Sequence, residues 1–201
     1  MNKAIAALLI ILLVPMVALA ANELIVTELM YNSIGTDVEW IEMFNNTETD
    51  LDLTGWYVVD GNIDHTHMPL SGTLGAGEVL LLVGDIDLFT AQYPGVTNYV
   101  DGVYFQTYPE GDWALNNGGD SVQIFNAADE LVFVVDYDDG GDWPSECDGD
   151  GPSLVLASTA CPDYNDPNCW IAGPDWGTPG IIEGTVATAS TSLGSLKALF
   201  R

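Results

Sequence analysis

The sequence predicts an all-β domain, built as a sandwich or barrel. Eight short runs rich in β-branched and aromatic residues follow one another at fairly even spacing, with turn-forming residues between them. Hydrophobic residues make up 48% of the 201 residues, and 6 Trp, 8 Tyr and 6 Phe supply bulky apolar surface. That composition is sufficient for a packed core and excludes a solvated acidic tail.

The expected strands end at Gly, Asn, Asp or Pro, the residues that favour turns. Asn45-Asn46-Thr47 and Asn116-Asn117-Gly118-Gly119 are two such turn sequences. In chain order the runs are Glu23 to Tyr31, Trp40 to Phe44, Trp56 to Val59, Val79 to Val83, Val103 to Phe105, Ser121 to Phe125, Leu131 to Tyr137 and Ser153 to Leu156.

One stretch is expected to be helical. Asp87 to Tyr93 has room for about two turns. Asp85 or Asp87 is a suitable N-cap, and Pro94 cannot continue a helix. The domain is therefore expected to carry one short helix beside its strands.

The charge is strongly one-sided. The chain has 30 acidic residues against 3 basic ones, with a formal net charge of −27, and the basic residues are Lys3, Lys197 and Arg201. Binding to nucleic acid or to an anionic membrane surface needs basic side chains, so the sequence excludes both. Divalent cations from solution are expected to accompany so acidic a surface. The alternative is that the acidity reflects a high-salt habitat, where salt screens the repulsion.

The amino-terminal segment has the pattern of an export signal. Lys3 precedes an apolar run, and Ala18-Leu19-Ala20 fits a signal-peptidase site, so cleavage is expected after Ala20. A retained membrane anchor is the alternative, although Pro15 interrupts the run. We expect a signal peptide at 1–20, one domain at 21–180, and a Thr/Ala/Ser linker with a short tail at 181–201. The protein would be extracellular or at the cell surface, and the tail is a candidate sorting signal.

Three cysteines in an exported chain allow one disulfide. Cys147 paired with Cys161 would close a loop of about 15 residues, and Cys161 paired with Cys169 would close a shorter one. The spacing leaves both pairings open. A catalytic thiolate is disfavoured at Cys147, because acidic residues surround it in the sequence.

Acidic residues concentrate between positions 136 and 150. Carboxylates on glycine-rich turns are the ligands that Ca²⁺ prefers, so this run is a candidate calcium site. The alternative is that these acids form turns and accept hydrogen bonds from backbone amides. No cofactor is expected to be required. The candidate ligands are Asp136, Asp138, Asp139, Asp148 and Asp150.

Four tryptophans are expected in Gly- and Pro-rich loops, Trp113, Trp143, Trp170 and Trp176, and the candidate partner contacts are Trp113, Trp143 and Trp176. Exposed tryptophan rings could contact a partner, and the alternative is that they cover the open ends of a sandwich. His65 and His67 could bind a transition metal from one strand face, although exposed histidines on an edge strand are commoner.

Two glutamates lie in the run Glu39-Trp40-Ile41-Glu42. Residues three apart in a strand point to opposite faces, which disfavours a catalytic carboxylate pair. Glu42 shares a face with Trp40 and Phe44, so we expect it to be a partly buried acid that accepts hydrogen bonds from turn amides near Asn45.

Taken in order, several motifs resemble the lamin tail domain family in its secreted bacterial form. They include Glu39-Trp40-Ile41-Glu42-Met43-Phe44-Asn45, Leu53-Thr54-Gly55-Trp56, Leu115-Asn116-Asn117-Gly118-Gly119-Asp120 and Gly177-Thr178-Pro179-Gly180. The resemblance covers residues 23–180. It implies an immunoglobulin-like β-sandwich used for binding and anchoring, often beside secreted hydrolases, and it implies no catalytic residues.

The function expected from these observations is an exported, non-catalytic binding or structural module. Its partner would be a surface protein or an extracellular polymer, with calcium as a candidate aid. The alternative is a secreted hydrolase that uses carboxylates, or an accessory domain of one. Two acids that converge in a concave pocket, one with a raised pKa, would favour the hydrolase.

Overall fold

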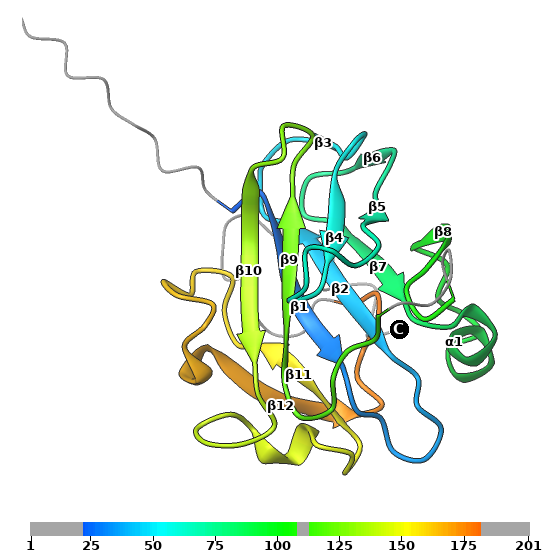
Figure 1. Ribbon diagram of the computed structural model, residues 1–201, viewed down its shortest axis with the longest axis vertical. Coiled ribbons are helices and arrows are strands. Elements are labelled where there is room, and N and C mark those ends of the chain that lie inside the picture. The colour runs from blue at the N-terminus through cyan, green and yellow to red at the C-terminus, as the bar shows by residue number, and fades with distance from the viewer. Residues whose placement is uncertain (1–21, 108–112, 182–201) are drawn as a thin grey trace, which may run out of the picture.

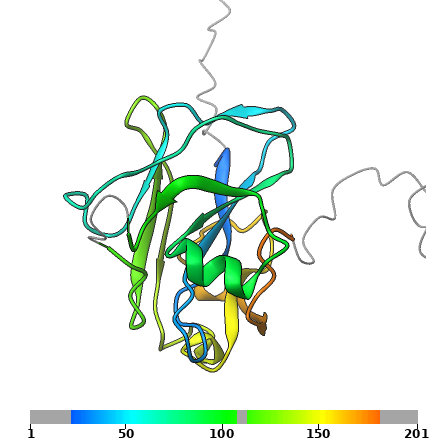
Figure 2. The ribbon, with the colours of Figure 1, turned by 90° about the vertical axis from the view of Figure 1, so that its right-hand side faces the viewer.

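The computed structural model describes residues 22–107 and 113–181 and shows two sheets packed face to face (Figures 1 and 2). The large sheet has the strand order β12-β11-β1-β2-β7-β8, and the small sheet has the order β10-β9-β4-β5. The large sheet comprises β1 (Leu24–Met30), β2 (Trp40–Asn45), β7 (Val79–Val83), β8 (Tyr99–Tyr104), β11 (Pro152–Leu156) and β12 (Trp170–Asp175). The small sheet comprises β4 (Tyr57–Val59), β5 (Met68–Pro69), β9 (Asp120–Phe125) and β10 (Leu131–Tyr137), and β3 (Leu51–Asp52) pairs with β6 (Thr73–Leu74).

The middle of the large sheet is covered on both faces. Every residue of β1 and β2 is buried, although both strands carry glutamates. Ile41 and Met43 face the main core between the sheets, whereas Trp40 belongs to a second apolar cluster on the other side of the sheet. Glu28 and Glu42 lie opposite each other in the antiparallel pairing of β1 with β2.

The small sheet alternates between buried and partly exposed residues. Val122 and Ile124 of β9 and Phe133 and Val135 of β10 face the core, and the residues between them are partly or fully exposed. This period of two is typical of an antiparallel sheet with one face in solvent. β10 lies at the edge of this sheet.

The helix α1 (Ile86–Gln92) covers the second apolar cluster near β7 and β8 (Figure 1). The Asp85 carboxylate accepts the amides of Asp87 and Leu88 at 2.9 and 3.1 Å, which caps the first turn. Phe89 is buried against the sheet, and the helix ends immediately before Tyr93 and Pro94. The expected all-β fold with one short helix is confirmed, with Asp85 as the cap.

The eight expected strands are all present, and β8 begins earlier than expected, at Tyr99. Four further strands were not expected, namely β3, β5, β6 and β12. Three of these have two residues each, which is too short for a periodic pattern. β12 contains Gly173 and Pro174, residues that ordinarily interrupt a strand and that are tolerated here because β12 lies at an edge.

The disulfide joins Cys161 to Cys169, the shorter of the two pairings left open by the sequence. Cys147 is free and only 1% exposed, and its thiol donates to the Ser153 carbonyl. The expected signal peptide and nearly all of the expected tail lie outside the described residues. Within the part of the chain that the structure describes, no helix is long and apolar enough to cross a membrane.

Candidate functional site

A pocket of about 580 Å³ opens beside the start of β2 and is lined largely by acidic and amide side chains. Its walls come from the segment before β2, the turn after β4, and the loop that leads into β9. We call it the acidic pocket, and define it by its four carboxylates and one histidine: Asp37, Glu39, Asp60, Asp120 and His65.

Glu39 is a buried carboxylate of the acidic pocket, on the segment just before β2. It is 2% exposed, and its Oε2 accepts the Leu115 amide at 2.7 Å. Burial raises the pKa of Glu39 to about 8, the charge of Asp37 adds to the rise, and hydrogen bonds from Leu115 and Gln106 oppose it. Glu39 therefore fixes the loop before β9 to the start of β2.

Asp60 and His65 form the opposite wall. The Asp60 carboxylate lies 2.7 Å from Nδ1 of His65 and accepts the Asn62 amide at 2.9 Å. Asp60 is buried and His65 is partly exposed. The turn sequence Asp60-Gly61-Asn62 produces this arrangement, because an Asp side chain readily accepts the amide two residues ahead.

The loop before β9 is held from both ends. Asp120 accepts the amides of Ser121 and Asn116 at 2.8 and 3.3 Å. The buried Tyr137 hydroxyl donates to the Asn116 carbonyl at 3.0 Å. The loop therefore has a fixed conformation, and Asp120 remains partly exposed at the pocket.

A second pair of acids is buried on the outer face of the large sheet. Glu28 and Glu42 are 2% and 1% exposed, and both accept hydrogen bonds from the segment after β12. Glu28 accepts the Thr178 amide at 2.9 Å, the Thr178 hydroxyl at 3.0 Å and the Ser153 hydroxyl. Glu42 accepts the Gly180 amide at 2.8 Å and the Thr27 hydroxyl at 2.7 Å.

Burial raises the pKa of Glu42 to about 7, against the opposing hydrogen bonds from Thr27 and Gly180. The expectation of a buried, hydrogen-bonded Glu42 is confirmed, but its partners are not the amides near Asn45. They are Thr27 and Gly180, and Gly180 lies 138 residues away in the sequence. Glu39 accepts from Leu115 and Glu42 from Gly180, so the two side chains are held by different loops.

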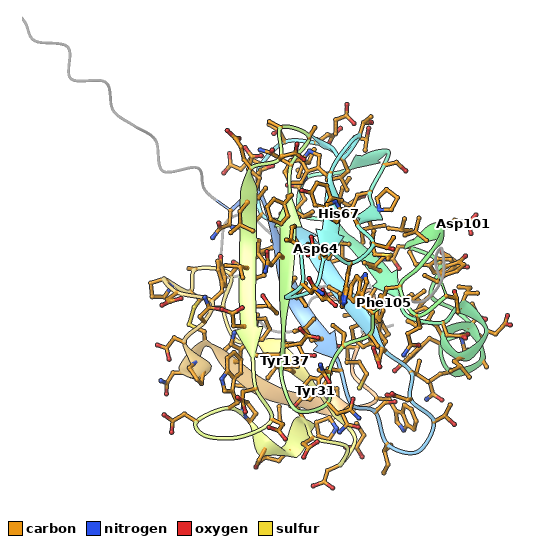
Figure 3. All side chains as sticks on the ribbon, viewed as in Figure 1. Tyr31, Asp64, His67, Asp101, Phe105 and Tyr137 are labelled. Carbon is orange, nitrogen blue, oxygen red and sulfur yellow. A yellow bond between two sulfur atoms is a disulfide. The ribbon has the colours of Figure 1, made fainter. Side chains whose placement is uncertain are left out.

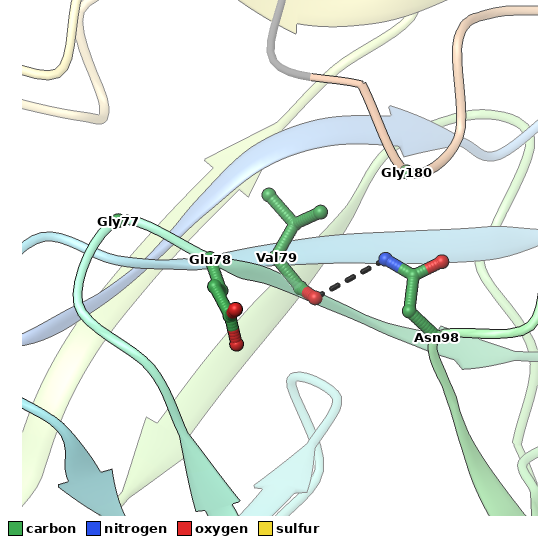
Figure 4. A pocket seen from close by; sticks show the side chains of 5 residues that line it. All are labelled: Gly77, Glu78, Val79, Asn98 and Gly180. Carbon is green, nitrogen blue, oxygen red and sulfur yellow. Dashed lines mark hydrogen bonds between the residues drawn. The ribbon is translucent and has the colours of Figure 1, made fainter.

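A smaller pocket, of about 490 Å³, lies beside this segment (Figure 4). It is lined by Gly77, Glu78, Val79, Asn98 and Gly180, and the Asn98 side-chain amide donates to the Val79 carbonyl at 3.2 Å. Among the described lining residues, Glu78 is the one that can ionise. Gly180 lines the pocket as well, and it is followed by Ile181, the last residue of the chain that the structure describes.

The candidate calcium ligands are dispersed. Asp136, Asp138, Asp148 and Asp150 are exposed, and Asp139 is partly exposed. The Asp138 carboxylate accepts the Gly140 amide at 2.9 Å and the Asp148 carboxylate accepts the Asn32 side-chain amide at 2.7 Å, which are turn and loop contacts. In residues 22–107 and 113–181, no three His, Cys, Asp or Glu side chains are placed to hold a metal ion.

A buried tyrosine lies behind this acidic run. The Tyr31 hydroxyl has no hydrogen-bond partner within the described part of the chain, and its ring packs on Tyr137 at 4.7 Å between centroids (Figure 3). Burial raises the pKa of Tyr31, and the nearby Cys147 and Asp148 add to the rise. No sequence signal identified this hydroxyl.

The tryptophans that were candidate partner contacts are partly or fully packed. Trp113 is buried, stacks on Phe105 at 4.7 Å, and donates to the Thr66 carbonyl at 3.0 Å. Trp143 and Trp176 are half-buried and pack against the main core and the second cluster respectively. Trp143 and Trp176 therefore keep some exposed surface that a partner could contact. Trp113 is buried, and it lines the acidic pocket.

The two histidines do not share a site. His65 pairs with Asp60, whereas the exposed His67 ring stacks on Tyr57 at 4.3 Å, between β4 and the start of β5 (Figure 3). The sequence had not indicated the acidic pocket. Its members are separated by up to 83 positions, from Asp37 to Asp120, and only the packing of two sheets brings them together.

Comparison with known proteins identifies the family. A family model described as Lamin Tail Domain matches residues 18–139, more than half of the chain. The match includes β1 to β10, and the motifs after residue 139 lie beyond it. A search of curated proteins finds none that matches. With an immunoglobulin-like sandwich and this family match, the chain belongs to the lamin tail domain family, a family of non-catalytic domains.

Proposed function

We propose that the chain is an exported, non-catalytic binding module that takes a cationic group of its partner into the acidic pocket. The observation that carries this proposal is the charge balance of the pocket. Asp37, Asp60 and Asp120 line it together with the buried Glu39, whose pKa is raised to about 8, and among the described lining residues His65 is the one side chain that can become positive. No Lys or Arg occurs between residues 4 and 196, so the described part of the chain supplies no lysine or arginine to the pocket.

The pocket is of a size that suits a side chain or a small ligand. Three of its four carboxylates, those of Glu39, Asp60 and Asp120, accept backbone amides, so little ordering of these three would be needed on binding. A lysine or arginine side chain of a surface protein, or an amine of an extracellular polymer, has the matching charge. Divalent cations, with calcium among them, are proposed to screen the remaining acids of the surface.

Titration calorimetry with N-acetyl-lysinamide and N-acetyl-argininamide tests the pocket. We expect Asp120→Asn to weaken binding by about tenfold or more. Asp101→Asn is the matched control, because Asp101 is an exposed carboxylate on β8 that does not line the pocket (Figure 3). Equal loss in both variants would mean that only the general negative charge attracts the probe, and the proposal would fail.

The export and calcium proposals have their own tests. Amino-terminal sequencing of the protein recovered outside the producing cell should begin at Ala21. Thermal unfolding should shift upward with calcium more than with magnesium or with sodium at matched ionic strength. An equal shift with sodium would leave screening alone as the explanation.

One observation favours the alternative function, a carboxylate-dependent hydrolase. The raised pKa of Glu39 beside Asp37 in a pocket is the arrangement expected of a general acid. However, Glu39 is 2% exposed and already accepts the Leu115 amide, so it is positioned to hold a loop. Hydrolysis of p-nitrophenyl glycosides that is abolished by Asp37→Asn would support the enzyme over the binding module.

A further inference from the structure

The open edge of β10 has the features of a site for strand addition. Two hollows, of about 300 and 430 Å³, lie along it and share the lining residues Asn22, Leu131 and Val132. One side of the first hollow is the segment that the disulfide at Cys161 helps to fix, from Pro162 to Asn165. We call this feature the β10 groove.

The backbone of β10 faces this groove with hydrogen-bonding groups that β9 does not use. The Asp136 amide donates to the Asn165 side chain at 2.7 Å, so it points away from β9. Alternate residues of a strand direct their amides the same way, and Val134 is two residues earlier without a register shift between them. The Val134 amide and carbonyl therefore face the groove, beyond the point that Asn165 covers.

The side chains along the groove are apolar in the middle and acidic at the rim. Leu131 is 52% exposed, and Val132 and Val134 are half-buried. Glu23 and Glu130 line the second hollow and Asp163 lines the first. A long exposed edge of this kind is usually blocked by lysines or prolines, and β10 has neither.

We propose that the β10 groove binds an extended segment of a basic partner protein as an additional strand. The Val134 amide and carbonyl would pair with the backbone of that segment, and Leu131 and Val132 would contact its apolar side chains. Its lysines or arginines would lie beside Glu23, Glu130 and Asp163. A second copy of this chain is a poor occupant, because both copies would present acidic rims.

This surface is separate from the acidic pocket, because the two share no lining residue. Blocking one would leave the other intact. The proposal thus goes beyond binding of a cationic group, and it predicts the conformation as well as the charge of the partner.

The test uses the full chain and peptides of about eight residues that alternate valine with lysine. Fluorescence anisotropy should show saturable binding, and hydrogen exchange should show slower exchange of the Val134 amide in the complex. A peptide with proline at alternate positions should bind about tenfold more weakly or not at all, because it cannot complete the ladder. Equal binding of the proline peptide would overturn the proposal, since charge alone would then suffice.

Two variants locate the binding. Leu131→Lys should weaken binding of the valine–lysine peptide by about tenfold, because the substitution places a positive charge in the groove. Ile171→Lys is the matched control, since Ile171 is 51% exposed on β12, an edge strand of the other sheet. Equal effects of the two substitutions would overturn the proposal.

Two other occupants would also overturn it. Self-association of the full chain that Leu131→Lys abolishes would show a second copy in the groove. Tighter peptide binding after deletion of residues 182–201 would show that the chain's own tail occupies it. A single, monomeric species that binds the peptide equally with and without the tail supports the basic partner.

Discussion

Replacement of Glu39 by glutamine should remove a large part of the pH dependence of stability. The pKa of Glu39 rises from 4.5 to about 8 on folding, so the folded state holds its proton more tightly than the unfolded state. The stabilisation that this shift provides is full below about pH 4.5 and is lost as the pH rises toward about 8. At about 1.4 kcal/mol per unit, the shift amounts to about 5 kcal/mol.

Urea unfolding followed by tryptophan fluorescence between about pH 4 and about pH 9 measures this effect. Near pH 4, Glu39→Gln should match the wild type, because a neutral amide still offers an oxygen to the Leu115 amide. Near pH 9 the variant should be more stable by several kcal/mol, up to about 5. General repulsion among the acids also lowers stability as the pH rises, so all measurements are made at high salt, which screens that repulsion.

Glu48→Gln is the matched control, because Glu48 is exposed and lies on a turn away from the pocket. It should follow the wild-type profile. Asp37, Asp60, Asp120 and His65 face the same pocket, and a protonated His65 would lower the shift at acidic pH. If Glu39→Gln lost stability with pH as steeply as the wild type, the raised pKa of Glu39 would be refuted.

Three further outcomes are expected. Cys161→Ser opens a loop whose ends are 8 residues apart and should lower the free energy of unfolding by about 2–3 kcal/mol, and an unchanged urea midpoint would contradict this. Cys147 should stay unmodified by a thiol reagent in the native protein and react after unfolding, because burial raises its pKa to about 12, and rapid native labelling would contradict this burial. Glu28→Ala leaves the buried hydroxyl of Ser153 and the partly buried donors of Thr178 unpaired and should cost about 3 kcal/mol in urea unfolding, whereas a cost below about 1 kcal/mol would mean that water replaces the carboxylate.

The long strands could be predicted from the sequence because their side chains carry the pattern themselves. In β9, Val122 and Ile124 are buried and alternate with partly exposed residues, whereas β2 was expected as a strand from its short apolar run between turn residues. The two-residue strand β5 (Met68–Pro69) has no such pattern, and it forms because β4 provides an edge to pair with. Its formation depends on tertiary context, which a local window of sequence does not contain.

The disulfide pairing and the acidic pocket also depend on tertiary context that a local stretch of sequence does not contain. The spacing of the cysteines in the sequence allowed Cys161 to pair with either Cys147 or Cys169. The fold brings Cys169 beside Cys161, and this determines the pairing. The acids around residue 140 looked like the richest cluster in the sequence, yet within the described residues no three of them are placed to hold a metal ion. The acids that do converge are far apart in the sequence, so their pocket carries no local signal.

The buried glutamates show how a chain with almost no basic residues holds its loops. Glu28, Glu39 and Glu42 each join a central strand to a loop 150, 76 or 138 residues away, and their partners are amides and hydroxyls. This use of acids needs no cation, because the backbone supplies the donors. Asp37 and Asp120 lie at the surface of the same region, and residues 22–107 and 113–181 contain no lysine or arginine to pair with them. Glu28 and Glu42 lie outside the acidic pocket and Glu39 forms a buried part of it, whereas Asp37 and Asp120 face the pocket at the surface. A cationic partner could therefore neutralise these two aspartates without disturbing the three glutamates.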